Sequence, residues 1–596
     1  MSTDDGTDRS RTFLALLAIA ALALVVRLVG LGVRIFHWDE GRVGYWILRY
    51  HETGTYFYRP IVHGPFLPIV NNYLFSVVPV SDFAARLPVA VVGGLLPLAA
   101  WLFRDRLRDD EVVAFALLLA LNPLMVYYSR FMRSDVLVAA FSLFALGFFV
   151  RTIDGGDLRN LYAAAAAMAL AFASKENALL YLLCWIGAGV LLVDHRLLWA
   201  SARDRPPRTV AFGDWPAAAA AWTREHGTSL RDGVYEVGAH VAGAFVVFFV
   251  VVVFFYAPRP EFWHAFAHPG TFPSVVHDAT FTQAGKFYDS WVGGSHQNHD
   301  YFPYLYDYLE TLAYGAPVVL VFSVIGFLVD RYGGTAHRFR ELVTLSVYWG
   351  VVSIAGYPIA TDIQAPWTTV HAVVPLSIPA AVGLAYVYRE GRAAVSVDDA
   401  AGGVLAAISI EDVVGVGLTA VVLLAAAGSV VGANAMYMNA AGENHKQVLQ
   451  WAQPSNDLKS TLREVRTVAE ANGGTDVLYY GTKKPGSDET LFYVQDEHSL
   501  DTPPPGGPAW HSRLPLPWYL ERDGAKVTST PPDESPAKAL SNPPPIVIAY
   551  GFDEQKVSPY LDGYTAHRHH FKLWGEDVVI FIEDSALARA RAGPNS

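Results

Sequence analysis

Runs of about 20 apolar residues recur along most of the chain, and this feature constrains the fold more than any other, because a helix of that length spans a bilayer. With 52% hydrophobic and only 17% charged residues, the sequence is also too apolar for a soluble enzyme of this length. We therefore predict a polytopic α-helical membrane protein with about eleven spans. Their approximate centres are Ala21, Leu95, Leu118, Phe144, Ala167, Gly187, Phe248, Leu320, Val351, Ile378 and Val422.

The distribution of arginine between the loops predicts an orientation. If the N-terminus is cytoplasmic, every inner loop is basic, as the positive-inside rule expects; Arg389 and Arg392 are one example. The first apolar segment, 12–31, has no small-residue cleavage site after a short apolar core, so we expect it to be retained. The prediction is an integral protein of the cell membrane with a cytoplasmic N-terminus.

The composition changes at the end of the last apolar segment. Beyond it, proline, charged residues and histidine replace the apolar runs. The stretch "STLREVRTVAEANGG" has helical spacing, whereas "TDVLYYG", "PPIVIAYG" and "EDVVIFIE" have the pattern of short strands. We predict a transmembrane domain at 1–436 and a small soluble α/β domain at 437–596 on the extracytoplasmic side.

The net charge argues against one class of partner, and the cysteine content excludes two kinds of cysteine-based cross-link or site. The net charge of −12 argues against nucleic acid as a main partner, because phosphate backbones require a basic surface. The single cysteine, Cys184, rules out an intramolecular disulfide and a cysteine-based metal cluster.

The unusual polar residues gather in the predicted outer segments, beginning with "IFHWDEGRVGY" in the outer loop 32–85. Asp39 and Glu40 follow the first span, and a solvated helix end is the simplest explanation for them. The alternative is that Trp38, Tyr45 and Trp46 form an interfacial belt that partly dehydrates the acids. A carboxylate held in this way could accept a proton from an acceptor hydroxyl.

A very short outer loop, "YYSRFMRSD", contains Arg130, Arg133 and Asp135, which is unusual because the positive-inside rule places basic residues in inner loops. An ion pair with Asp135 would explain one arginine. Alternatively, an arginine faces a phosphate, which its planar set of donors fits well.

Two further outer sites carry candidate residues. In "FASKENALL", Lys175 and Glu176 either form a local salt bridge or supply a lysine that neutralises a lipid phosphate. In "APWTTVHAVVP", Trp367 and His371 begin a span, where aromatic residues usually act as interface anchors.

The second large outer loop, 257–310, contains His264 and His268 at a helical i, i+4 spacing that can bind zinc. No HExxH motif accompanies them, which weakens the case for a zinc site. We name His264 and His268 as the candidate metal ligands, and a divalent metal ion as the one cofactor that the sequence suggests. The alternative is an amphipathic loop that covers the active cavity.

The order of these motifs resembles a known class of enzyme. The acidic pair, "HGPFLPIV" from His63, "AARLPVAVVGG" around Arg86, Asp135 after its arginine-rich loop and "ASKEN" are similar to GT-C glycosyltransferases. The nearest branches are dolichyl-phosphate-mannose protein mannosyltransferases and lipid A aminoarabinose transferases. Within the class the chain looks most like the archaeal flippase-activity-associated family.

The resemblance implies specific roles. Asp39 would act on the acceptor nucleophile, Glu40 would be the second acid of its motif, and Asp135 would be the acid of the second outer loop. The nearby basic residues would hold the lipid phosphate that leaves. We include the following among the predicted substrate-binding residues: His63, Arg86, Arg130, Arg133, Lys175, Glu176, Trp367 and His371.

The predicted function is transfer of a sugar from a polyprenyl (dolichyl) phosphate donor to a glycan, lipid or protein acceptor on the outer face. The alternative is a non-catalytic protein, associated with a flippase or binding a lipid-linked glycan in a surface-glycan or protein N-glycosylation pathway. A secondary transporter ranks last, because no charged residue lies clearly at the middle of a span.

Overall fold

The computed structural model describes residues 3–60, 64–201, 230–291, 299–333, 339–361, 363–395, 410–497, 499 and 505–592. The chain divides into two compact units. The helical unit comprises Met1–Gly30, Phe57–Leu67 and Leu87–Met438. The mixed unit comprises Leu31–Tyr56, Pro68–Arg86 and Asn439–Ser596. Most of the first outer segment therefore packs with the C-terminal region, and the division into two domains at 436/437 stays a prediction.

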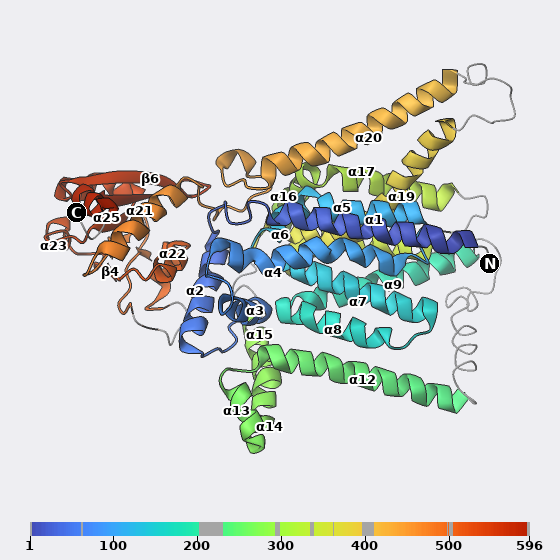
Figure 1. The fold of residues 1–596 in the computed structure, drawn as a ribbon, viewed down its shortest axis with the longest axis horizontal. Coiled ribbons are helices and arrows are strands. Elements are labelled where there is room, and N and C mark those ends of the chain that lie inside the picture. Colours follow the sequence, from blue (N-terminus) through green and yellow to red (C-terminus); the bar gives the residue numbers. More distant parts are fainter. Residues whose placement is uncertain are drawn as a thin grey trace. The chain divides into compact units, whose positions relative to one another are not determined.

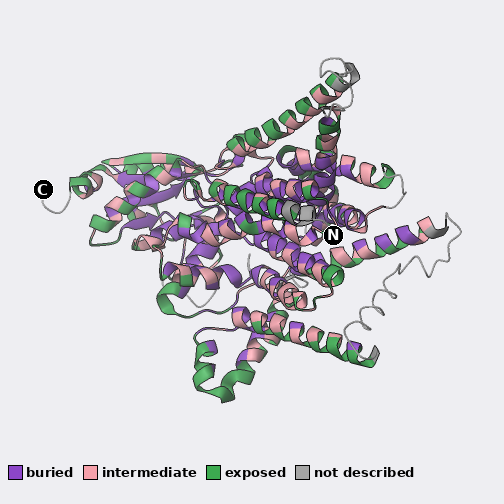
Figure 2. Ribbon diagram, turned by 45° about the vertical axis from the view of Figure 1, so that its right-hand side comes forward, coloured by how far each residue is buried: buried purple, intermediate pink, exposed green. Residues whose placement is uncertain are grey.

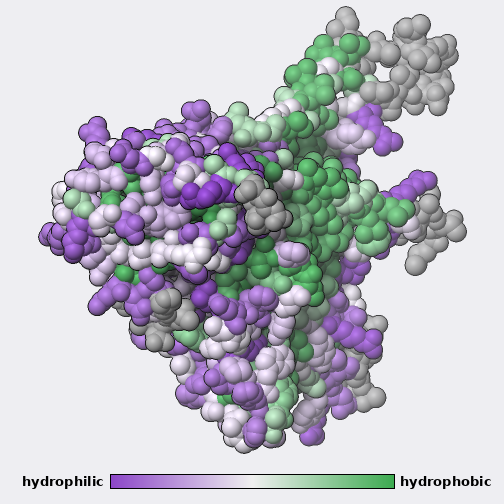
Figure 3. Space-filling model, turned by 60° about the vertical axis from the view of Figure 1, so that its left-hand side comes forward, coloured by the Kyte–Doolittle hydropathy of each residue, from purple (hydrophilic) through white to green (hydrophobic). Residues whose placement is uncertain are grey.

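Among the described residues, eight helical segments are long and apolar enough to cross a membrane (Figure 1). They are α1 (Thr3–Leu28), α4 (Asp82–Leu95) with η1 (Leu96–Phe103), α7 (Asp135–Gly155), α9 (Ala178–Ser201), α12 (Leu230–Tyr256), α18 (Glu341–Ala360), α19 (Val370–Val395, preceded by η4, Pro366–Thr369) and α20 (Ile410–Tyr437). On the face drawn in Figure 3, hydrophobic side chains form a broad continuous surface, coloured green.

Two more apolar segments are broken. The pair α5 (Asp109–Leu121) and α6 (Pro123–Ser129) bends by 50°, and the pair α16 (Tyr301–Gly315) and α17 (Pro317–Tyr332) bends by 93°. A proline begins the second helix of each pair, where its missing N–H costs nothing. At the first break the Asn122 side chain also accepts the N–H groups of Leu124 and Met125, which starts a new helix.

The prediction of a polytopic helical membrane fold is confirmed, but the described residues supply eight to ten spans rather than about eleven. All the predicted centres lie in helices. The centre near Ala167 lies in α8 (Asn160–Ser174), whose 15 residues are fewer than a full span needs.

Helix α19 forms the core of the helical unit, because 83% of its apolar stretch is buried. It packs closely on α17 because Gly326 and Gly383 lie at the contact. A Cβ added to Gly326 would lie 1.8 Å from the carbonyl oxygen of Pro379, so only glycine fits there. Small residues at such positions let helix backbones approach in a membrane.

The mixed unit contains a five-stranded sheet in the order β4-β1-β5-β7-β6. Strands β4 (Val527–Ser529), β1 (Val477–Tyr479) and β5 (Ile546–Tyr550) are parallel, whereas β7 (Glu576–Glu583) runs antiparallel to β5 and to β6 (Tyr564–Lys572). One face buries Leu478, Val547 and Phe581 in a common core. The short hairpin of β2 (Thr482–Lys483) and β3 (Thr490–Leu491) is separate from this sheet.

Helices accompany this sheet in the mixed unit. The helices described there are α2 (Trp38–Thr53), most of α3 (Phe66–Phe75), η5 (Glu443–His445), α21 (Leu458–Ala471), η6 (Pro508–Arg513), α22 (Leu516–Arg522), α23 (Pro536–Ala539), η7 (Gly551–Asp553), α24 (Glu554–Val557), η8 (Ser558–Tyr560) and α25 (Asp584–Ala592), besides the first residues of α4. The predicted α/β character of the C-terminal region is confirmed, and the three predicted strands are β1, β5 and β7.

Candidate functional site

In the helical unit, the first residue of α7 is the centre of a buried polar cluster. Asp135 is 1% exposed, and its Oδ2 lies 3.2 Å from Nε of Arg133. Its Oδ1 lies 3.8 Å from Nζ of Lys175 and 3.6 Å from Nε2 of His371. The fold therefore brings together four of the predicted site residues, from the loop before α7, the turn after α8 and the start of α19.

His371 is held in place by two tyrosines that no sequence motif singles out. Its Nδ1 lies 2.7 Å from the hydroxyl of Tyr181, and its ring stacks on Tyr357 at 4.6 Å. Among the described residues, Oδ1 of Asp135 and Nε2 of His371 have no hydrogen-bond partner although both are buried. The two atoms face each other at 3.6 Å, which is longer than a hydrogen bond.

Arg133 has a second contact besides Asp135. Its guanidinium lies 3.5 Å from the ring centre of Trp367, which is buried. Trp367 is thus not an exposed interface anchor, because its ring holds the arginine in position. The cluster sets the charges of Arg133 and Lys175 against a single carboxylate, so it carries net positive charge and suits an anion.

Glu176 does not form the local salt bridge that its position beside Lys175 suggests. Its Oε1 accepts hydrogen bonds from the hydroxyls of Tyr58 at 2.5 Å and Tyr256 at 2.7 Å, while Lys175 faces Asp135. Burial raises the pKa of Glu176, although the two hydroxyl donors oppose that shift. Glu176 fixes the turn that presents Lys175.

Arg130 is bound by the backbone. Its guanidinium donates to the carbonyl oxygens of Val26, Arg27, Val29 and Gly30 at the end of α1, at 2.7 to 3.1 Å. The last carbonyls of a helix lack partners within it, and an arginine is well suited to cap them. The contacts give Arg130 a structural role, so we do not carry it into the proposed phosphate site.

In the mixed unit, Asp39 and Glu40 lie in the first turn of α2, where the helix dipole favours acids. The turn is a capping box with an unusual member, His37. Nδ1 of His37 accepts the N–H of Asp39 at 3.0 Å, and Oε2 of Glu40 accepts the N–H of His37 at 3.0 Å. Nε2 of His37 lies 2.6 Å from Oε1 of Gln450, which fixes the ring.

Glu40 and Arg86 form a buried ion pair. Nε and Nη2 of Arg86 donate to the two carboxylate oxygens of Glu40, both at 2.7 Å, and its Nη1 donates to the carbonyl oxygens of Leu31 and Arg34. Burial alone would raise the pKa of Glu40, but the charges of Arg86 and Arg34 outweigh it and lower that pKa to about 2. Glu40 and Arg86 therefore hold the loop before α2 in place.

Asp39 has a different neighbour, Arg42, which lies one turn later on α2. Burial lowers the pKa of Arg42 to about 10, and the charge of Asp39 opposes this shift. The guanidinium of Arg42 also lies 5.5 Å from the ring centre of Trp38. Arg42 is absent from the predicted site residues; its i+3 spacing from Asp39 was the available signal.

The aromatic residues around Asp39 pack into the mixed unit rather than form an interfacial belt. Tyr45 is buried in a cluster with Trp510 and Leu514, and Trp38 and Trp46 pack against it. A glycine brings α2 against α22, because a Cβ added to Gly44 would lie 2.6 Å from the ring of Trp518.

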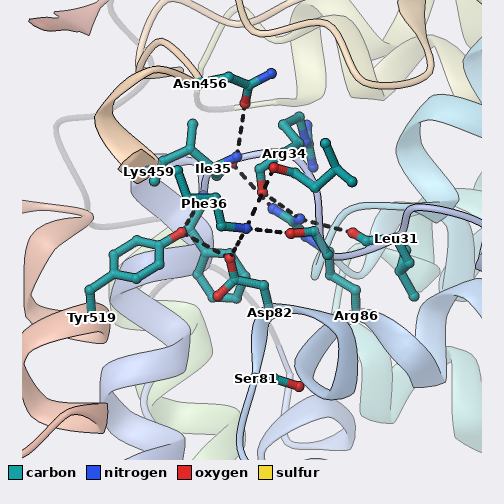
Figure 4. Close-up of polar contacts among 12 residues, drawn as sticks. Leu31, Arg34, Ile35, Phe36, Ser81, Asp82, Arg86, Asn456, Lys459 and Tyr519 are labelled. Carbon is teal, nitrogen blue, oxygen red and sulfur yellow. Dashed lines mark hydrogen bonds and ion pairs between the residues drawn. The ribbon is translucent and has the colours of Figure 1, made fainter. Parts of the chain in front are cut away.

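A second buried acid, Asp82, ties the first outer segment to the C-terminal region within the mixed unit (Figure 4). It pairs with Lys459 at 2.5 Å and Arg522 at 3.2 Å, and it accepts a hydrogen bond from the Tyr519 hydroxyl at 3.2 Å. That hydroxyl in turn accepts the N–H of Phe36 at 2.9 Å. Nothing in the sequence around Asp82 indicates this role.

The remaining predicted residues are not placed in a site. His63 lies outside the described residues. His264 and His268 are exposed on and after α13 (Glu261–Ala267), with Nδ1 of His268 3.3 Å from the carbonyl oxygen of His264. In the described ranges no group of three or more His, Cys, Asp or Glu side chains is placed to hold a metal ion.

Comparisons with known proteins give both a family-model match and a similar solved structure. Residues 62–204, which include Asp135 and Lys175, match the family model of dolichyl-phosphate-mannose-protein mannosyltransferase. Among solved structures, ArnT from Cupriavidus metallidurans in the apo state is similar, with 17% identity, coverage of 96% of this chain and 98% of that chain, and a TM-score of 0.52. The chain has the GT-C fold.

A second family model and a second solved structure are also similar to this chain. Residues 458–583 match the family model of the Agl23 flippase-associated protein C-terminal domain. The archaeal oligosaccharyltransferase AglB from Archaeoglobus fulgidus is similar at 12% identity, covering 94% of this chain and 72% of that chain, with a TM-score of 0.49. Comparison with curated proteins gives no match. The two family-model matches and the fold shared with ArnT confirm the resemblance inferred from the sequence motifs, although those motifs gave no sign of the match in the C-terminal region.

Proposed function

We propose that this chain is a membrane glycosyltransferase that moves a sugar from a polyprenyl (dolichyl) phosphate donor to a glycan, lipid or protein acceptor on the outer face. The observation that carries the proposal is the buried cluster of Arg133, Lys175 and His371 around Asp135. All of its members except His371 lie in the segment that matches a family described by a dolichyl-phosphate sugar donor.

The proposed reaction is a displacement at the anomeric carbon of the donor sugar. The acceptor hydroxyl oxygen forms the new bond, and the bond from the sugar to the phosphate oxygen breaks with its electron pair remaining on the phosphate. The base that takes the proton of the hydroxyl is the acid that the sequence motifs predict for this role, Asp39. Arg133 and Lys175 stabilise the charge that develops on the leaving phosphate, an effect that is large where water is excluded.

A metal ion has no assigned residue in this proposal. Asp135 is already engaged by two cations, which disfavours a divalent ion at its carboxylate. A chelator added to the assay tests whether transfer needs a divalent ion.

A second candidate function is a non-catalytic protein that binds a lipid-linked glycan or assists a flippase. The observation that favours it is the match of residues 458–583 to a flippase-associated domain. Such a protein would use the basic cluster for the lipid phosphate without needing Asp39.

The two functions are separated by measuring donor binding and sugar transfer on the same purified, full-length protein with radiolabelled dolichyl phosphate mannose. We expect Asp39→Asn to bind donor like wild type but to transfer sugar about 10²–10⁴-fold more slowly. We expect Lys175→Met to weaken donor binding about 10-fold to 100-fold.

Asp562→Asn is the matched control, because Asp562 is an exposed acid of the mixed unit. It should leave both quantities unchanged. Wild-type binding without any transfer would support the second function, and full transfer by folded Asp39→Asn protein would refute the proposed role of Asp39.

A further inference from the structure

The segment that follows α12 presents a row of aromatic side chains to the outside. It continues through α13, η2 (Pro269–Thr271), α14 (Phe272–His277) and η3 (Asp278–Thr282) to α15 (Gln283–Trp291). Trp263, Phe266 and Phe272 are 47%, 62% and 38% exposed. The ring centres of Trp263 and Phe266 lie 6.1 Å apart, as do those of Phe266 and Phe272, so the three form one surface, which we call the aromatic ridge.

The ridge is held outward by contacts on its other side. Phe262 and Ala265 of α13 are buried, and the buried guanidinium of Arg259 lies 4.6 Å from the ring centre of Phe262. Arg259 also donates to the carbonyl oxygens of Ala257 and Phe254 near the end of α12. The short helices are therefore tied to the end of a span, and their free face is exposed (Figure 2).

The ridge continues the apolar surface of a predicted span. Only 6% of the apolar stretch of α12 is buried. The exposed side chains of this helix include Phe245, Phe249 and Val250. Phe254 near the end of α12 contacts Trp263 with ring centres 6.4 Å apart. The apolar surface thus passes from the span into the ridge.

We propose that the aromatic ridge inserts into the interfacial layer of the lipid bilayer at the end of α12. Tryptophan and phenylalanine on short amphipathic helices favour this layer, because their rings leave water while the backbone stays near the headgroups. Exposed aromatic patches of this kind on a soluble surface would invite aggregation. The segment is therefore a membrane contact. This inference does not depend on the proposed enzyme activity.

A depth measurement on the full-length protein in phosphatidylcholine and phosphatidylglycerol vesicles tests the proposal. Because Cys184 is the only cysteine, Cys184→Ala gives a background in which Phe266→Cys carries one spin label. Collision rates with oxygen, which concentrates in lipid, and with a nickel chelate, which stays in water, then report depth. Phe249→Cys on α12 is the lipid reference, and Asp562→Cys in the mixed unit is the water reference.

We expect the oxygen-to-nickel ratio at Phe266 to lie between the two references and well above the value at Asp562. A label at Phe272→Cys should give the same result, which guards against misfolding at one position. A ratio equal to that at Asp562 would overturn the proposal by showing water at the ridge. Low collision rates with both reagents would also overturn it, because protein would then cover the ridge.

Discussion

At the residue scale, adjacent acids in the first outer segment have different environments. Glu40 is buried and bound by Arg86 through two hydrogen bonds, whereas Asp39 faces His37 with 3.8 Å between Oδ2 and Nδ1. Removing one member of a buried ion pair leaves the other charge uncompensated. Replacing Glu40 should therefore lower the free energy of unfolding more than replacing Asp39.

We predict that Glu40→Gln lowers the free energy of unfolding by about 3–5 kcal/mol. Asp39→Asn should change it by much less, because no bidentate pair holds the Asp39 carboxylate and the N–H of Asp39 that bonds His37 remains. Thermal unfolding of both variants in the same detergent checks this. Equal losses of stability would mean that Asp39 is also structural.

His511 gives the mixed unit a predictable response to acid. Burial, aided by the charge of Arg42, lowers the pKa of His511 from 6.5 to about 4. As the pH falls below 6.5 the unfolded chain takes up this proton first, so stability is lost between pH 6.5 and about 4. We expect wild type to lose on the order of 1–3 kcal/mol more than His511→Gln over this range. Unfolding midpoints of the two proteins at several pH values measure the difference.

The same residues show what a sequence can and cannot predict. The pairing of Arg133 with Asp135 is local, and it is one of the two alternatives that the loop suggests. The ion pair between Glu40 and Arg86 joins segments that are distant in the sequence, and so do the ion pairs of Asp82. No local sequence pattern predicts such contacts. An arginine in an outer loop needs a partner, and the sequence suggests a lipid phosphate for Arg130. The partners of Arg130 are instead backbone carbonyl oxygens at the end of α1.

At the element scale, α2 depends on a close approach to α22. A Cβ at Gly44 would lie 2.6 Å from Trp518, and one at Gly41 would lie 2.6 Å from Pro515. We predict that Gly44→Ala destabilises the protein by about 1–3 kcal/mol through overpacking. Gly473→Ala, where a Cβ meets nothing within 4 Å, should change stability by less than about 0.5 kcal/mol. Chemical unfolding of both variants measures the two changes, and similar losses would show that crowding is not the cause.

Helices are easier to predict than their breaks. The apolar runs locate every span, because a membrane helix needs a long continuous stretch. They do not reveal the 93° bend between α16 and α17, because hydropathy records how apolar each residue is and not which way the helix axis points. Pro317 and the Asn122–Pro123 pair are the available signals, and both begin a new helix. Strands β4 and β6 escape prediction because Val527–Ser529 is short and β6 contains mostly polar residues.

At the scale of the whole molecule, the loop arginines predict that the N-terminus is cytoplasmic and the C-terminal region extracytoplasmic. A single cysteine at Asp562 in the Cys184→Ala background should react with a membrane-impermeant maleimide on intact cells. A cysteine at Asp157, in an exposed turn predicted to be inside, should react only after the membrane is opened. The reverse pattern would invert the proposed topology and move the acceptor to the inner face.

Whether this chain is an enzyme is decided by giving the purified wild-type protein, in vesicles, radiolabelled dolichyl phosphate mannose and an extracted lipid-linked glycan. We predict labelled glycan together with release of an equal amount of dolichyl phosphate, and at least about 100-fold less of both with Asp39→Asn. Donor that is bound by wild type but neither released nor transferred to this acceptor, or transfer that is unaffected by Asp39→Asn, would contradict the proposed mechanism.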